Sequence, residues 1–393
     1  MSLDPDFGVS LSPGEFQERL LTLHKQLFAS TEFSFDDVTT HMLSPPPGLS
    51  LWDHSIIHDG QDFHLYHGMG DNRLQPEWSR RFRAGDWEGA GALGFATCIG
   101  RAVGPTLLDL KRVASLDLPS QGQFDVALRD HGALFRYKGR YGLLYDVRGG
   151  RDGKVFLGMS LSWSDDLEHW EQGDRNPVLT APSWGDPAGM CKDPHVMEVD
   201  GVYLIYTQVM DRDGYCAVAL TTTTDWMSFD DEGCVLRSAP MLRGTLGIES
   251  ACVVRRDGMW HLFFTYGPGM WQAVSPSPRR FTWSREQLWH YGGGFYYMGP
   301  FHATEVVHHD GQWWLTTTRK EEIRRLNRVA GRLCFRGTYE DEKSLEEGLF
   351  RALFDLVPPG GHIMVEYESS GQKDSERILS LDYPPVTSPL GYL

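Results

Sequence analysis

Short stretches of alternating polar and apolar residues dominate the chain from about residue 50 to residue 330. One pattern recurs five times: a polar or acidic head residue, a short apolar run, a turn with glycine, and then an aromatic and aliphatic run. The turn glycines are Gly60, Gly139, Gly201, Gly258 and Gly311. Alternation with a period of two is typical of half-buried strands, and Asp-Gly turns favour tight hairpins. Each copy therefore predicts an antiparallel β-hairpin.

The repeated hairpins predict a radial fold. Strand repeats at a spacing of roughly 40–50 residues or a little more are typical of a β-propeller, whose blades surround a central channel. Further alternating stretches follow three of the hairpins, at 159–170, 219–229 and 273–283, and these would supply outer strands of blades. We expect an all-β, five-bladed β-propeller over residues 50–330.

The two ends of the chain have a different pattern. Apolar residues between Phe16 and Leu27 recur at helical spacing, and three prolines at 45–47 end this stretch. We expect residues 1–49 to form an N-terminal leader with a short helix. Residues 331–393 contain strand-like runs, so we expect this segment to complete the propeller or to pack on it.

Composition and charge narrow the classes of partner. The chain has 393 residues, of which 41% are hydrophobic and 23% charged, as in ordinary globular proteins, and its net charge is −16. That charge disfavours nucleic acids and acidic membrane surfaces as partners but not a neutral sugar. The sequence shows no basic segment followed by an apolar run, as in a signal peptide, and no apolar stretch long enough to span a membrane. We therefore expect a cytoplasmic location.

The cysteines give no sign of a metal centre. Six are scattered along the chain, and none belongs to a C-x-x-C pair. We therefore expect free thiols, no metal and no cofactor.

The head residues of the five repeats carry the candidate chemistry. They are Asp53, Asp130, Asp193, Glu249 and His302. A radial fold brings matching points of its repeats to one channel, so these side chains are expected to line one pocket. Glycoside hydrolysis uses one carboxylic acid to protonate the leaving oxygen and a second carboxylate to attack or to activate water. Crowded carboxylates cannot all ionise, so one of them keeps its proton.

Simpler roles for single residues stay open. An aspartate before a strand is often a turn residue, Asp130 has Arg129 beside it as an ion-pair partner, and His302 could be a satisfied buried histidine. The rings of Trp52 and Trp271 could stack on the apolar faces of a sugar or pack between blades.

Three short motifs resemble the propeller glycoside hydrolases of families 32, 43 and 68. Residues 51–55 (Leu-Trp-Asp-His-Ser) resemble the Trp-Asp-Ser motif of family 68. Residues 192–195 (Lys-Asp-Pro-His) resemble the Arg-Asp-Pro motif of families 32 and 68 and the Asp-Pro-His of some family 43 members. Glu249, in Ile-Glu-Ser, matches the position of the family acid, and His302 that of a family 43 histidine.

The resemblance implies a role for each matching residue. It makes Asp53 the nucleophile or base, Glu249 the general acid, and Asp193 a carboxylate that binds the sugar and tunes Glu249. It implies a substrate-binding set around them: Trp52, His54, Asp130, His195, Trp271 and His302.

The implied function is hydrolysis of a small furanose-containing glycoside or oligosaccharide, as by a β-fructofuranosidase. Families 32 and 68 retain anomeric configuration, whereas family 43 inverts it, so an arabinofuranosidase or xylosidase of the family 43 type is an alternative. A propeller that binds sugars without cleaving them is a further alternative, because fold alone does not fix function.

Overall fold

The computed structural model describes residues 48–237 and, further on, residues 248–318, 330–336, 362–369, 372–373 and 377–379. Within 248–318 it leaves gaps at 257–258, 267–268, 276, 282–294, 300–301 and 311. The helical leader predicted for 1–49 lies almost entirely outside these residues. None of the described helices is long and apolar enough to cross a membrane.

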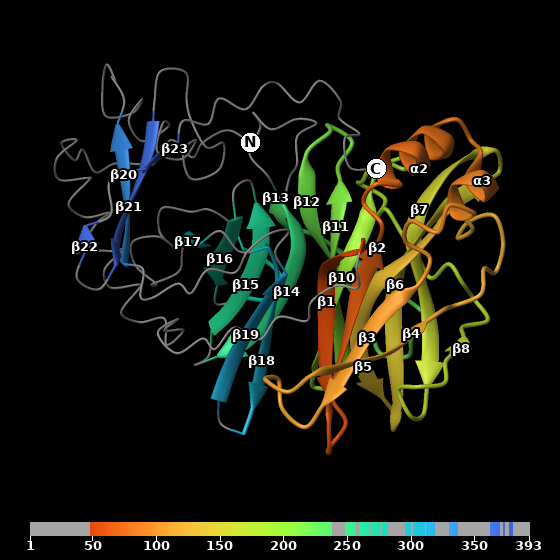
Figure 1. The fold of residues 1–393 in the computed structure, drawn as a ribbon, viewed down its shortest axis with the longest axis horizontal. Helices are drawn as coiled ribbons and strands as arrows, with labels where there is room; N and C mark the ends of the chain where they lie inside the picture. The colour runs from red at the N-terminus through yellow and green to blue at the C-terminus, as the bar shows by residue number, and fades with distance from the viewer. Residues whose placement is uncertain are drawn as a thin grey trace. The chain divides into compact units, whose positions relative to one another are not determined.

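Four complete blades follow one another along the described chain, which confirms an all-β propeller fold (Figure 1). The first blade contains β1 (Ser50–His58), β2 (Phe63–Gly70), β3 (Ile99–Gly104) and β4 (Lys111–Leu116). The second contains β5 (Leu128–Tyr137), β6 (Arg140–Arg151), β7 (Lys154–Ser164), β8 (Glu171–Gln172) and β9 (Leu179–Thr180). The third contains β10 (Cys191–Val199), β11 (Val202–Met210), β12 (Cys216–Thr223) and β13 (Asp230–Arg237). The fourth contains β14 (Glu249–Arg256), β15 (Met259–Tyr266), β16 (Gly269–Ser275) and β17 (Phe295–Gly299).

The fifth repeat forms only a two-stranded sheet among the described residues, β18 (His302–His309) with β19 (Gln312–Thr318). The prediction of five blades is therefore wrong: the residues that the structure describes form four complete blades. Outer-strand signals follow the second, third and fourth hairpins, whereas the residues after Thr318 begin with a charged Arg-Lys-Glu-Glu run without alternation. The inner strands still form a closed ring, because β18 contacts both β14 and β1.

Hairpin chemistry explains the strand boundaries. Asp200 and Gly201 both have positive φ, at 52° and 80°, between β10 and β11. These angles suit a two-residue type I′ turn, for which Asp-Gly is a favoured sequence. In the first blade the Asp59 side chain instead accepts the N–H groups of Gln61 and Asp62, which makes a wider turn. The predicted turns around Gly258 and Gly311 lie outside the described residues.

Aromatic side chains pack the blades against each other. Phe135 of the second blade stacks on Trp226 of the third, with ring centroids 3.9 Å apart and planes 13° from parallel. Leu144, Ile205 and Val209 are fully buried in the same cluster. Large rings bury extensive apolar area, so such contacts are the main source of cohesion between neighbouring sheets.

Two helices that were not predicted interrupt the first blade between β2 and β3. They are α2 (Gln75–Arg83) and α3 (Trp87–Gly91), and they lie together near one end of the strands (Figure 1). Trp78 and Phe82, four residues apart, bury one face of α2, and the Trp52 ring packs against the same cluster. The helices thus support a residue of the candidate site.

The strands after residue 330 pair with one another and belong to a second compact unit. They are β20 (Ala330–Arg336), β21 (His362–Ser369), β22 (Gln372–Lys373) and β23 (Arg377–Leu379). The domain boundaries at 49 and 330 remain predictions.

Candidate active site

Every inner strand carries a pairing irregularity close to its head residue. In four of them a non-glycine residue at this point has positive φ: Asp53 (20°), Asp193 (53°), Ser250 (53°) and Ala303 (48°). This backbone region costs about 1–3 kcal/mol per residue for a side chain other than glycine. β-Bulges redirect side chains and are frequent beside active sites, so the repeated irregularity marks the channel end of each hairpin.

The bulges also show that the five predicted heads do not share one register position. Asp53 and Asp193 occupy the bulged position itself, whereas Glu249 and His302 come one residue before it. At the bulged position of the fourth blade the chain has Ser250.

Ser250 joins the two aspartates that were predicted to be catalytic. Its hydroxyl donates to Asp53 Oδ1 at 2.8 Å, and its backbone N–H donates to Asp193 Oδ2 at 3.1 Å. Oxygen atoms of these two carboxylates and a nitrogen of His131 all lie within 4.8 Å of one another. Asp193 is only 3% exposed, and Asp53 is slightly more open. The aspartates of the first and third blades therefore meet in the channel.

Lys192 connects Asp193 to Glu249. Its ammonium Nζ lies 3.1 Å from Asp193 Oδ2 and 3.1 Å from Glu249 Oε2. Burial opposes the charged ammonium, but the carboxylates of Asp193 and Glu249 outweigh it and raise the pKa of Lys192. All three residues predicted as catalytic from the sequence thus belong to one hydrogen-bonded cluster.

His131 provides a second positive charge beside Asp53. Its Nε2 lies 3.8 Å from Asp53 Oδ2, and its side chain is almost fully buried. Burial alone would lower the pKa of His131, but Asp53, Asp130 and Asp146 together raise it to about 10. A protonated His131 ring stabilises the carboxylate of Asp53.

Asp130 positions Trp52. The indole N–H of Trp52 is shared between the two Asp130 oxygens, at 3.0 and 2.8 Å. Burial opposes the charge of Asp130, yet His131 and Trp52 lower its pKa. Arg129 donates to the Asp125 carbonyl, which is a different partner from the one expected. A Cβ at Gly68 would lie 2.1 Å from the Trp52 indole nitrogen, so glycine is required there.

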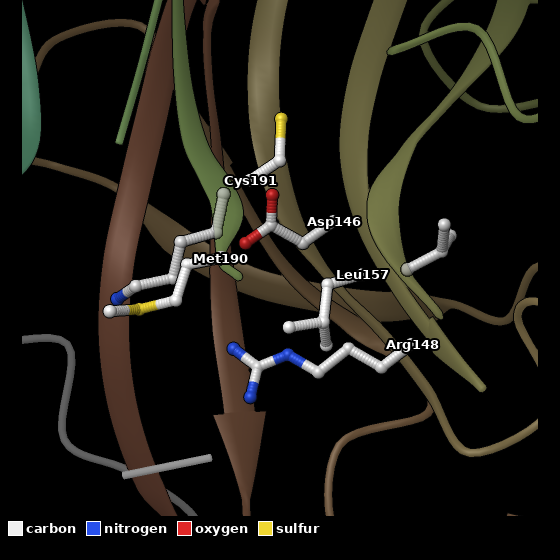
Figure 2. Close-up of a pocket in the computed structure, with 7 residues that line it drawn as sticks. Asp146, Arg148, Leu157, Met190 and Cys191 are labelled. Carbon is white, nitrogen blue, oxygen red and sulfur yellow. The ribbon is translucent and has the colours of Figure 1, made fainter. Parts of the chain in front are cut away.

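A fifth carboxylate, Asp146, was missed by sequence reasoning. It lies on β6, is 2% exposed, and accepts the backbone N–H of Asp193 at 3.2 and 3.3 Å. Burial and the charge of Asp193 raise the pKa of Asp146 to about 7, against the opposing charges of His131 and Arg148. Figure 2 shows its carboxylate in a small pocket whose lining includes Arg148, Leu157, Met190, Cys191 and Lys192.

We expect Asp146→Asn to stabilise the protein above neutral pH. The folded state keeps the Asp146 proton up to about pH 7, whereas the unfolded chain releases it near pH 4. Folded molecules therefore bind more protons in this window, so this group makes stability fall as pH rises through it. Asparagine cannot ionise and keeps an acceptor for the Asp193 N–H. Urea unfolding should show a gain of about 1–3 kcal/mol at pH 8 and little at pH 4.

Asp59→Asn is a control for which we expect the opposite change in stability. Burial opposes its charge, but the N–H groups of Asp62 and Gln61 and the ring of His64 lower the pKa of Asp59 to about 2. The ionised Asp59 carboxylate stabilises the folded state above pH 4, and this contribution is lost as the pH falls through 2. The Asp59→Asn variant should therefore be less stable than wild type at pH 8. A loss for Asp146→Asn that is equal at pH 4 and pH 8 would contradict the assignment.

The structure describes the side chains of two predicted histidines, His54 and His195, and both form hydrogen bonds with residues outside the carboxylate cluster. His54 is buried, its Nε2 lies 2.6 Å from Thr316 Oγ1, and burial lowers its pKa to about 4. His195 Nε2 donates to the Val253 carbonyl at 3.0 Å. The backbones of Trp271 and His302 lie in β16 and β18, and their side chains are outside the described residues. Substrate binding by this set remains a prediction.

Comparisons with known proteins support the fold. No family model matches the sequence, and no curated protein matches it. Among solved structures, the chain is similar to the Bombyx mori GH32 β-fructofuranosidase BmSUC1, with a TM-score of 0.52 and 11% identity over 92% of this chain and 70% of that one. It is similar to the sucrose-6-phosphate hydrolase of Lactobacillus gasseri, with a TM-score of 0.52 and 13% identity over 90% and 67%.

A thermostable family-43 glycoside hydrolase is also similar, with a TM-score of 0.50 and 12% identity over 89% of this chain and 99% of that one. The shared property at these identities is the fold, a β-propeller of the kind that glycoside hydrolases of families 32 and 43 use.

Proposed function

We propose that this chain is a glycoside hydrolase that cleaves small furanose-containing glycosides, in the manner of a β-fructofuranosidase. The observation that carries the proposal is the meeting of Asp53, Asp193 and Glu249 in one cluster joined by Ser250 and Lys192. Two carboxyl groups with different surroundings are the requirement of most glycosidases. Solved structures of the same fold include a variant of the Bombyx mori β-fructofuranosidase in complex with sucrose.

Asp53 has the surroundings of a nucleophile or base. The Ser250 hydroxyl donates to one of its oxygens, and the His131 imidazolium faces the other. Both interactions favour the ionised carboxylate, which is the form that attacks an anomeric carbon or activates water. Its backbone at the bulge fixes the direction of this short side chain.

Glu249 has the reach and surroundings of the general acid. Lys192 holds its carboxylate in the described structure, and the same ammonium also contacts Asp193. In the proposed reaction the leaving-group oxygen takes the place of Lys192 at Glu249, and Lys192 stays with Asp193. Glu249 then donates its proton to that oxygen. Asp193 is too deeply buried to act as the acid and serves to hold Lys192 and Ser250.

Inverting hydrolysis is the second candidate, because the matched family-43 structure is covered over nearly its whole length. An arabinofuranosidase or xylosidase of that type would use Asp53 as the base for a water molecule. NMR of the first-formed product distinguishes the two, since retention yields the anomer of the substrate and inversion yields the opposite one.

The test is hydrolysis of sucrose, a fructo-oligosaccharide and the nitrophenyl arabinofuranoside and xyloside by the purified full chain. Turnover of a fructoside with retention supports the proposal, and turnover of an arabinoside or xyloside with inversion selects the second candidate. Calorimetric binding of these sugars without any turnover would make the chain a sugar-binding propeller and reject both.

A further inference from the structure

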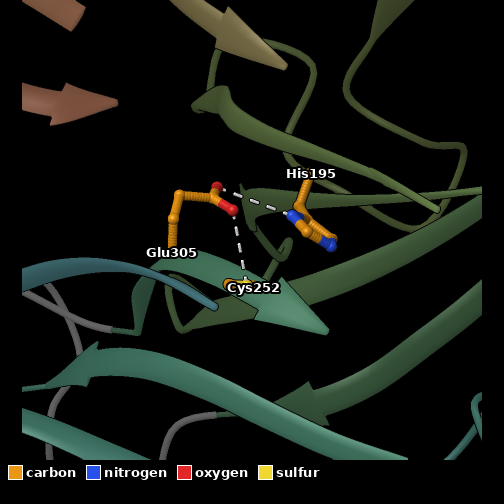
Figure 3. A group of neighbouring side chains, drawn as sticks. All are labelled: His195, Cys252 and Glu305. Atoms are coloured by element: carbon orange, nitrogen blue, oxygen red, sulfur yellow. Dashed lines mark hydrogen bonds and ion pairs between the residues drawn. The ribbon is translucent and has the colours of Figure 1, made fainter. Parts of the chain in front are cut away.

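A second polar cluster lies in the ring of inner strands, and one of its members, His195, also belongs to the predicted substrate-binding set. It consists of His195 on β10, Cys252 on β14 and Glu305 on β18, one side chain from each of three successive inner strands. Figure 3 shows the three side chains directed toward one another. Cys252 is fully buried, and His195 and Glu305 are largely buried.

The spacing of the three donor atoms suits one tetrahedral ion. The Cys252 sulfur lies 3.5 Å from Glu305 Oε2, and His195 Nδ1 lies 3.6 Å from Glu305 Oε1. One ligand atom from each of the three residues can be chosen so that all three atoms lie within 4.8 Å of one another. Zinc bonds of about 2.3 Å to sulfur and about 2.0 Å to nitrogen or oxygen place tetrahedral ligands roughly 3.3–3.6 Å apart. The two separations from Glu305, one at each of its oxygens, are close to these values.

The neighbouring backbone orients two of the donors. The Val253 carbonyl can only accept, so His195 donates to it from Nε2 and turns Nδ1 toward Cys252 and Glu305. Metal-binding histidines commonly use a carbonyl partner in this way, because it fixes the tautomer and the ring plane. The Val306 N–H donates to the Cys252 sulfur at 3.4 Å, an interaction that also stabilises a thiolate.

We propose that His195, Cys252 and Glu305 bind one zinc-class divalent ion. Nitrogen, sulfur and oxygen donors together favour zinc or a similar transition metal, whereas calcium and magnesium prefer oxygen ligands. The ion would tie the hairpin β18–β19 to the third and fourth blades. The prediction of no metal was based on the absence of a C-x-x-C pair. Such a pair is not needed for this site, because its three ligands come from separate repeats.

Cobalt(II) binding to the chelator-treated full chain tests this site without reference to activity. We expect one cobalt ion per chain and a near-ultraviolet absorption band from thiolate-to-cobalt charge transfer. Zinc should displace the cobalt and raise the midpoint of thermal unfolding by a few degrees at saturating concentration. Cys252→Ser should abolish the band, and Glu305→Gln should weaken cobalt binding by about 10-fold or more.

Cys191→Ser is the matched control, because Cys191 is another buried cysteine of an inner strand and should leave the band unchanged. Wild-type protein decides the matter even if Cys252→Ser fails to fold. A wild-type chain that takes up no stoichiometric cobalt or zinc and shows no thiolate band overturns the proposal. A band that survives in Glu305→Gln at full affinity removes Glu305 from the site.

Discussion

Glu249→Gln is expected to lower kcat for an unactivated glycoside such as sucrose by about 10²–10⁴-fold, the usual contribution of a general acid. Glutamine keeps the shape of the side chain and an oxygen for the Lys192 ammonium, but it has no proton to give to the leaving oxygen. Steady-state kinetics of the purified variant measures the loss. The KM should change much less, because the missing proton matters chiefly in the transition state.

Substrates with a better leaving group distinguish the role of Glu249 as the acid from that of Asp53 as the nucleophile. A nitrophenolate departs without protonation, so Glu249→Gln should keep most of its activity on a nitrophenyl glycoside of the preferred sugar. Asp53→Asn should lose activity on both substrates, because its carboxylate is needed whichever group departs. Glu198→Gln, at an exposed position on β10, is the control and should match wild type. An equal loss on both substrates for Glu249→Gln would assign that residue a role other than the acid.

Lys192→Met is expected to lower the free energy of unfolding by about 2–4 kcal/mol. The change leaves Asp193, which is almost fully buried, and Glu249 without their shared positive partner. An uncompensated buried charge is costly, and the methionine cannot supply hydrogen bonds. Urea unfolding of the variant beside wild type measures the loss.

Lys192→Arg and Lys154→Met are the controls for this prediction. Arginine restores the positive charge and should recover most of the stability, although its different geometry will not restore all activity. Lys154 lies on an exposed part of β7, so its replacement by methionine should change stability by less than about 0.5 kcal/mol. Full stability of Lys192→Met would show that the bridge to Asp193 and Glu249 contributes little.

The periodic part of the fold could be predicted from the sequence because a hairpin is a local structure. Alternation and turn glycines identified the hairpins β1–β2, β5–β6 and β10–β11. The helices α2 and α3 were missed because they are short and interrupt a blade, although Pro76 with Trp78 and Phe82 four residues apart is a usable helix signal. The number of blades was predicted wrongly because each repeat in the sequence marks a hairpin and not a whole blade. Only four of the hairpins are joined by outer strands in the described chain.

The candidate site was predictable where a charged residue lies among the first residues of an inner strand, as at Asp53, Asp193 and Glu249. Asp146 was missed because it sits inside an apolar strand, where a lone charge was not considered, although burying one without partners is expensive. Ser250 and His131 were not predicted because the repeat pattern assigns only one head residue to each repeat. The bulges shift the phase of the heads by one residue, and no local sequence signal fixes that shift.

The bond between Ser250 and Asp53 joins residues 197 positions apart in the chain. During synthesis at about 5–20 residues per second, the strand with Asp53 leaves the ribosome roughly 10–40 seconds before the strand with Ser250. For that interval the Asp53 carboxylate has neither its hydroxyl donor nor the neighbouring blade that closes the ring. The first hairpins therefore expose their inner strand edges until the later blades have been synthesised.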